Sequence, residues 1–176
     1  LQKLLQDRTF DDLALPLYIV AADLESGQPI VFKKGPLLDA LEASLALAGL
    51  VAPAERNQRS LVDGGLVNPM PASILVEHGA GLVVGVNTIP RPTRKGILPS
   101  RGKIDLTSTW LRLRDQLAYT ALMNSLRHLD LLIMLQVDQF DGTDFDRAAE
   151  LIASGLAATQ REIHHIRTLL APDTRL

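Results

Sequence analysis

Residues 61–71 of this chain read LVDGGLVNPMP, in which two apolar residues lead straight into an aspartate and a pair of glycines. The apolar residues are typical of a buried strand, and the turn begins at its end. Glycine tolerates positive φ and close backbone approach, so Gly64 and Gly65 allow a sharp turn. Such a turn would hold the Asp63 carboxylate beside the crevice in which open α/β sheets bind ligands. Considered alone, the stretch is better explained by an ordinary Asp-Gly turn, because such turns are common.

The flanking segments predict strands and helices in alternation. Apolar runs predict buried strands at residues 17–22, 29–32, 61–62, 82–86 and 131–137, the first two forming a hairpin. Helical spacing predicts helices at residues 36–49, 71–79, 106–129 and 145–170, with Pro36 in the first turn of the first helix and a break or bend near Gly155. Residues 52–60 and 88–103 are predicted loops. We therefore expect an α/β fold with a parallel or mixed sheet and helices on both faces.

Composition excludes several kinds of protein. Hydrophobic residues make up 47% and charged residues 22% of the 176 residues, which is typical of a globular chain. A net charge of -2 gives no reason to expect nucleic acid as a partner. The chain has no cysteine, which excludes disulfides, thiol chemistry and cysteine-based zinc sites. No apolar run reaches the roughly 18 residues that a membrane-spanning helix needs.

Ordered blocks of residues on both sides of Asp63 carry a family resemblance. In chain order they are residues 21–24 with Gly27, Phe32 and Gly35; Ala40, Ala43, Ser44 and Gly49; residues 63–65 with Asn68, Pro69 and Pro71; Gly79, Ala80 and residues 82–86; and residues 144–147 and 150–152 with Gly155. Together they resemble the patatin-like phospholipase family, and most closely its bacterial branch related to neuropathy target esterase. The resemblance covers nearly the whole chain and is weakest at residues 88–103.

The resemblance implies a carboxylic ester hydrolase that acts on lysophospholipids, phospholipids or related acyl esters. It implies a Ser–Asp dyad, in which a serine on a Gly-x-Ser-x-Gly elbow attacks the ester and Asp63 is the base, with no histidine between them. Gly64, Gly65 and Asn68 are expected to hold the Asp63 turn, and neither a metal nor an organic cofactor is implied. An aspartate with an ordinary pKa of about 3.9 is a weak base for a hydroxyl, so this chemistry requires a desolvated site and an oxyanion hole.

The chain departs from the family pattern in two places. It contains no Gly-x-Ser-x-Gly and no glycine triplet, and in the family both lie upstream of the segment that this chain resembles. Since the chain also begins at Leu1 without methionine, we expect residues 1–176 to be the C-terminal part of one patatin-like domain. Its partner would then be the missing N-terminal part, and the chain alone would be inactive. Ala48 is the second departure, because the family commonly has proline there.

Several other residues have candidate roles that we weigh against simpler ones. Ser44, Ser60 and Ser73 lack the glycines of a nucleophile elbow, so packing or surface roles are expected. Asp23 follows a strand and is expected to make structural hydrogen bonds. His164 and His165 are neighbours on a predicted helix and point about 100° apart, so they cannot readily bind one metal ion. His78 and His128 are isolated, and solvated roles suit all four histidines.

Contact with a membrane surface is possible on the sequence alone. The predicted loop at residues 88–103 carries five basic residues and no acid: Arg91, Arg94, Lys95, Arg101 and Lys103. They could meet phospholipid headgroups, but a solvated loop is the better explanation. The helix around Trp110, Leu111, Arg112 and Arg114 could rest on a bilayer, but packing on a sheet accounts equally for its apolar residues. We expect a cytoplasmic protein, or one peripheral to the inner face of a membrane.

Two other functions stay open on the sequence. The chain could be a non-catalytic module that binds lipid or a partner protein, or part of an acyltransferase. The coding sequence upstream of Leu1 separates the first of these from the esterase, because only the esterase requires a serine elbow in the same frame.

Overall fold

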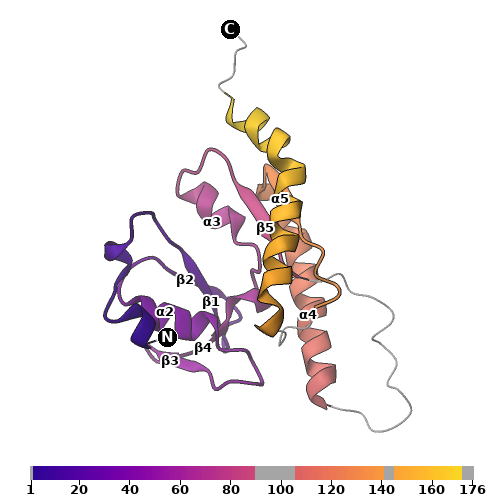
Figure 1. The fold of residues 1–176 in the computed structure, drawn as a ribbon. Helices are drawn as coiled ribbons and strands as arrows, with labels where there is room; N and C mark the ends of the chain where they lie inside the picture. The colour runs from indigo at the N-terminus through magenta and orange to yellow at the C-terminus, as the bar shows by residue number, and fades with distance from the viewer. Residues whose placement is uncertain (1, 90–105, 141–144, 172–176) are drawn as a thin grey trace, which may run out of the picture. The chain divides into compact units, whose positions relative to one another are not determined.

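The computed structural model describes residues 2–89, 106–140 and 145–171 and has an α/β fold (Figure 1). The chain forms two compact units. Unit 1 consists of Leu1–Pro71 and Asp105–Leu122, and unit 2 of Ala72–Ile104 and Met123–Leu176. Most of the basic loop predicted at residues 88–103 lies outside the described residues. Among the described helices, none combines the length and the apolar character that crossing a bilayer requires.

Unit 1 contains a four-stranded antiparallel sheet in the order β2-β1-β4-β3. Its strands are β1 (Ile19–Asp23), β2 (Pro29–Phe32), β3 (Ala54–Arg56) and β4 (Arg59–Asp63). β1 lies in the middle and is buried along its whole length, as its continuous apolar sequence predicts. The predicted hairpin is confirmed, with Ala21 opposite Ile30.

The prediction of a loop at residues 52–60 was wrong. Residues 54–56 form β3 and residues 59–60 begin β4. The two strands are joined at Asn57 and Gln58, whose φ values are 50° and 62°. β3 is an edge strand with no fully buried residue, so it shows no apolar run from which a strand could be recognised.

One face of this sheet is covered by α2 (Leu37–Ser44). Alanine, leucine and glutamate favour the helix, and Pro36 precedes it as the N-cap rather than within the first turn. Leu37, Ala40 and Ala43 are its buried side, and fully burying a leucine of this kind stabilises a fold by about 1.5–3 kcal/mol. The helix ends before the predicted stop at Gly49, because residues 45–51 turn instead.

The opposite face of the sheet packs against the residues that flank Asp63. Ala22 of β1 and Val62 of β4 point to this face and form a cluster with Ala48. Leu66 and Val67, which follow the Asp63 turn, pack against the same cluster. The turn is therefore anchored by apolar contacts on the side of the sheet away from α2.

Unit 2 contains a two-stranded parallel sheet of β5 (Val84–Asn87) and β6 (Leu131–Met134). Its other described elements are α3 (Ala72–Glu77), the 3-10 turns Leu126–His128 and Phe145–Arg147, and α5 (Ala148–Leu170). Leu131 and Ile133 of β6 form a core with Ala158 of α5. α4 (Leu106–Ser125), whose predicted helix is confirmed, contributes residues to both units.

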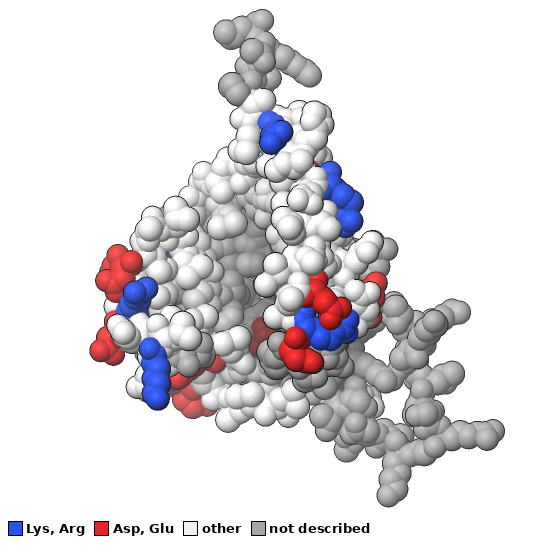
Figure 2. Space-filling view, in the orientation of Figure 1, with Lys and Arg blue, Asp and Glu red and all other residues white. Residues whose placement is uncertain are grey.

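α5 differs from its prediction and has an unusual surface. It runs through Gly155 without the predicted break, and Gly155 lies over the Leu135 side chain. Ile152 and Leu156, four residues apart and so on one side of the helix, are 71% and 59% exposed. Figure 2 shows mainly uncharged atoms along the middle of this helix.

The predicted α/β class, with both parallel and antiparallel strand pairing, is confirmed. The two kinds of pairing occur in separate sheets, each with a helix on a face: α2 on the first and α5 on the second. That residues 1–176 are one part of a single domain stays a prediction.

Candidate active site at the Asp63 turn

Asp63 is the last residue of β4 and lies opposite Ala21 of the central strand. Its backbone N–H donates to the Ala46 carbonyl oxygen at 2.9 Å. Its side chain caps the 3-10 turn Gly64–Leu66, where Oδ1 accepts a hydrogen bond from the Gly65 N–H at 2.8 Å. Main chain and carboxylate are thus both held, which gives the side chain a defined direction at the end of the strand.

In the described part of the chain, the two carboxylate oxygens of Asp63 differ in their contacts. Within residues 2–89, 106–140 and 145–171, Oδ2 has no hydrogen-bond partner. The residue is half-buried, between a buried strand interior and the surface. One oxygen is therefore fixed by the protein while the other can accept a proton from a hydroxyl brought close to it.

Gly64 is required by close packing of main chain. A Cβ at this position would overlap the Val20 carbonyl oxygen and lie 2.7 Å from the Val20 carbonyl carbon. Neither Gly64 nor Gly65 has a positive φ, so the reason is the approach to β1 and not a left-handed conformation. A Cβ at Gly65 would lie 3.2 Å from Asp63 Oδ1, so this glycine leaves room for the carboxylate itself.

Asn68 closes the turn through its main chain. Its N–H donates to the Gly64 carbonyl oxygen at 2.9 Å, and the Val67 N–H donates to the same oxygen at 3.1 Å. These bonds follow directly on the Gly65–Asp63 bond, so residues 63–68 form one compact hydrogen-bonded unit.

Asp23, the other acid on the two inner strands, is held by hydrogen bonds and an ion pair. It is buried, with 6% exposure, and accepts hydrogen bonds from the Glu25 N–H at 3.0 Å and the Ser26 N–H at 3.4 Å. Arg59 forms an ion pair with it at 3.4 Å. Burial raises the pKa of Asp23, but the bonds from Glu25 and Ser26 and the charge of Arg59 outweigh it and hold the pKa below its usual value. Asp23 closes the β1–β2 hairpin, in keeping with the expected structural role.

The candidate serines lie in unrelated surroundings. Ser44 ends α2 and is half-buried, Ser60 donates to Glu55 Oε1 at 2.8 Å, and Ser73 lies in α3. In the described part of the chain none of the three is hydrogen-bonded to Asp63.

The histidines are likewise spread over separate elements. His164 and His165 are exposed on α5, and the nearest acid to the His165 ring is Glu162 at 3.7 Å. His78 lies 2.7 Å from the Ile74 carbonyl oxygen in α3, and His128 accepts from Arg127 at 3.1 Å. Across residues 2–89, 106–140 and 145–171, no three histidine or acidic side chains are grouped to hold a metal ion.

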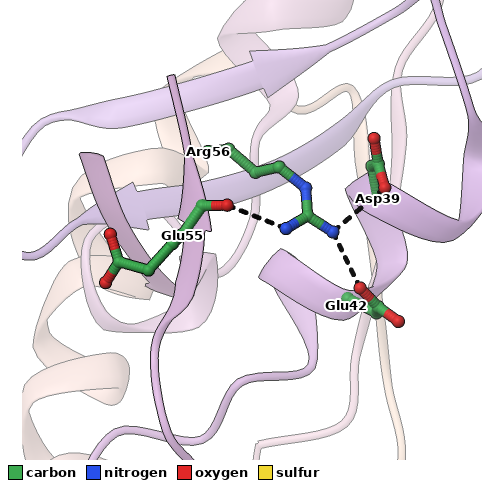
Figure 3. A network of polar contacts seen from close by, with 4 residues as sticks. All are labelled: Asp39, Glu42, Glu55 and Arg56. Atoms are coloured by element: carbon green, nitrogen blue, oxygen red, sulfur yellow. Dashed lines mark hydrogen bonds and ion pairs between the residues drawn. The ribbon is translucent and has the colours of Figure 1, made fainter. Parts of the chain in front are cut away.

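Arg56 forms a network that sequence patterns do not predict (Figure 3). From edge strand β3 its guanidinium donates to Asp39 at 3.0 Å and Glu42 at 2.8 Å on α2, and to its neighbour's carbonyl, Glu55 O, at 2.8 Å. The partners are 14 and 17 residues away along the chain, with no local spacing to reveal them. The network ties β3 to α2, at the far edge of the sheet from β2.

Comparison with known proteins finds a family match that includes the Asp63 turn. The family model of patatin-like phospholipases matches residues 1–76, which include Asp63 and all of the first sheet. The similar blocks at residues 79–86 and 144–155 lie outside the matched region.

Three relatives are each similar to about half of this chain. An uncharacterized NTE family protein of Mycobacterium tuberculosis is 38% identical over 77 residues, which are 44% of this chain and 21% of the relative. A second such protein of this species is 33% identical over 85 residues, 48% of this chain and 14% of the relative. The patatin-like phospholipase domain-containing protein 6 of Mus musculus is 32% identical over 89 residues, 49% of this chain and 7% of the relative. The chain thus spans about a fifth or less of the length of these relatives. Residues 1–76 thus match the patatin-like phospholipase family, and about half of the chain is similar to NTE family proteins.

Proposed function

We propose that this chain is part of a serine carboxylic ester hydrolase that acts on phospholipids, lysophospholipids or related acyl esters, with Asp63 as the base of a Ser–Asp dyad. The observation that carries the proposal is the state of the Asp63 carboxylate. It is held at the end of an inner strand, inside the segment that matches the family, with Oδ1 bonded and with no partner for Oδ2 among the described residues.

The proposed reaction has two steps with the same base. Asp63 takes the proton of a serine hydroxyl while the serine oxygen attacks the ester carbonyl carbon. The tetrahedral intermediate collapses to an acyl-serine, and the alcohol leaves with the proton from Asp63. Water then attacks the acyl-serine, again losing its proton to Asp63, and the fatty acid is released as the serine regains its proton. Backbone N–H groups would hold the oxyanion in both steps.

The serine and the oxyanion loop are proposed to lie upstream in the same polypeptide. The test therefore uses the protein encoded by the continuous reading frame that contains this chain. We expect a Gly-x-Ser-x-Gly segment upstream of Leu1, and hydrolysis of lysophosphatidylcholine and of a short p-nitrophenyl ester by the purified protein.

The Asp63→Asn substitution tests the role of the base. Asparagine keeps an oxygen acceptor for the Gly65 N–H, so the turn should survive, as circular dichroism would confirm. Loss of the base should reduce kcat by about 10²–10⁴-fold. Glu25→Gln is the matched control, since it removes an exposed carboxylate from the hairpin of the same sheet. If Asp63→Asn retains the activity of Glu25→Gln, the dyad is wrong.

The isolated 176-residue chain gives a second test. Without the upstream serine it should hydrolyse the p-nitrophenyl ester no faster than buffer does. Robust hydrolysis that disappears in Asp63→Ala would contradict the proposed location of the nucleophile. A third measurement separates hydrolysis from acyl transfer in the longer protein. It compares the amounts of free fatty acid and of newly formed ester when an alcohol acceptor is present.

A further inference from the structure

The segment at residues 45–51 carries the main-chain acceptor for Asp63. The Asp63 N–H bonds to the Ala46 carbonyl oxygen, two residues before Ala48. The segment belongs to no helix or strand. Its internal bonds run from the Leu47 N–H to the Leu45 carbonyl oxygen at 2.9 Å, and from the Leu50 and Val51 N–H groups to the Leu47 carbonyl oxygen at 3.0 and 2.9 Å. The start of the segment is bonded to α2 through the Leu45 and Ala46 N–H groups, at 2.9 and 3.4 Å. Among the described residues, no main-chain bond attaches residues 48–51 to another element.

Ala48 packs against Ala22 and Val62, and Trp110, on α4 in the same unit, attaches the Ala48 main chain. The indole Nε1 donates to the Ala48 carbonyl oxygen at 2.7 Å, a short and direct hydrogen bond. Gly49 makes room for the ring, because a Cβ there would lie 2.7 Å from Trp110 Nε1 and 3.1 Å from Cδ1. Gly49 also has a φ of +83°, so the absence of a side chain serves both the turn and the indole contact.

We propose that Trp110 is a positioning residue for Asp63. By holding the Ala48 carbonyl it fixes residues 45–51, and through the bond between Ala46 and Asp63 it fixes the end of β4 that carries the carboxylate. The effect on catalysis rests on the proposed function, in which Asp63 is the base. The effect on the position of Asp63 does not, and can be measured on this chain alone.

Amide hydrogen exchange of the 176-residue chain, followed by NMR, tests the positional effect. Trp110→Phe keeps an aromatic ring but removes the N–H donor. Losing one such bond should raise the exchange rate of the Asp63 amide by roughly 2- to 10-fold. The Asp23 amide, bonded to the Gln28 carbonyl oxygen at 2.9 Å, is the internal control and should not change. An unchanged Asp63 rate, or an equal rise at both amides, would overturn the proposal.

A pair of alanine variants perturbs the contact from its other side. Gly49→Ala pushes against the indole, whereas Gly79→Ala imposes a similar backbone strain, at φ +86°, with nothing within 4 Å of the new methyl group. Trp110 is the single tryptophan of the chain, so its fluorescence reports the contact directly. Gly49→Ala should shift the emission to longer wavelength and speed Asp63 exchange, and Gly79→Ala should do neither. The same behaviour in both variants would refute the role of the indole.

Kinetics of the longer esterase complete the test. Trp110→Phe should lower kcat by roughly 2- to 10-fold and leave KM within about 2-fold, because the base is displaced while substrate binding is not. If the wild-type protein hydrolyses no ester, the proposed function fails and the exchange data still decide the positional effect. If the wild type is active and kcat is unchanged in the variant, the catalytic effect of Trp110 is refuted.

Discussion

Replacing Gly64 by alanine should break the close contact between the Asp63 turn and the central strand. The new Cβ would overlap the Val20 carbonyl oxygen and lie 2.7 Å from its carbon and 3.1 Å from the Ala21 nitrogen. All three atoms belong to main chain, so no side chain can move aside to relieve the clash. Either β4 must shift away from β1 or the turn must lift from the sheet.

The expected loss in the free energy of unfolding follows from these two responses. Overpacking of a well-packed interior costs about 1–3 kcal/mol. Moving the end of β4 also weakens the Asp63–Ala46 hydrogen bond, which adds about 0.5–1.5 kcal/mol. We therefore expect a loss of about 2–4 kcal/mol in the free energy of unfolding. For a chain of this size that corresponds to a fall of about 5–15 °C in Tm.

Urea unfolding followed by tryptophan fluorescence is the appropriate assay. Trp110, the single tryptophan, belongs to the unit that contains Gly64, so its signal follows the affected unit. Gly65→Ala is the matched control, because its Cβ would meet only the Asp63 carboxylate, at 3.2 Å. Gly65→Ala should cost less stability and, under the proposed function, displace the carboxylate and reduce kcat of the longer protein. Equal stability of Gly64→Ala and wild type would show that the contact with Val20 does not require glycine.

Three further predictions follow from other parts of the chain. The pKa of Asp23 is lowered in the folded state, so its ionised form stabilises the fold above the unfolded pKa of about 4, and this contribution is lost as the pH falls through the folded pKa. The difference in urea midpoint between wild type and Asp23→Asn should therefore be full at pH 7 and shrink below about pH 4; a constant difference would contradict this. Gly155→Ala should raise Tm, because α5 is unbroken at this position and alanine is favoured over glycine in a helix by about 1 kcal/mol. The new methyl group has room, since the nearest side-chain atom would lie 3.8 Å away. A lower Tm would show that the methyl group does not fit. Ile152 and Leu156 are exposed, so replacing both by lysine should reduce light scattering by the isolated chain without loss of helical circular dichroism. Ala158→Lys is the contrasting variant, because Ala158 lies on the buried side and its replacement should unfold the helix.

The sequence was sufficient where neighbouring residues decide the structure. The continuous apolar run of β1, the turn that follows Asp23 and the helix formers of α2 act within a few residues of chain, so the hairpin and the helix could be predicted. The position of Asp63 at the end of a strand followed from an apolar pair and a glycine pair in direct succession. The order of the blocks around it also predicted a resemblance to a family, and the family model confirmed it over residues 1–76.

Tertiary structure decided what depends on residues far apart in the chain. β3 has no apolar pattern of its own and exists because it pairs with β4 and is tied to α2 by Arg56. Gly64 has to be glycine because the carbonyl of Val20, 44 residues earlier, lies against it. The indole of Trp110 reaches the Ala48 carbonyl across 62 residues. Local propensity acts over one turn of helix or one strand. Contacts of this kind form only when folding brings distant segments together, so no spacing in the sequence predicts them.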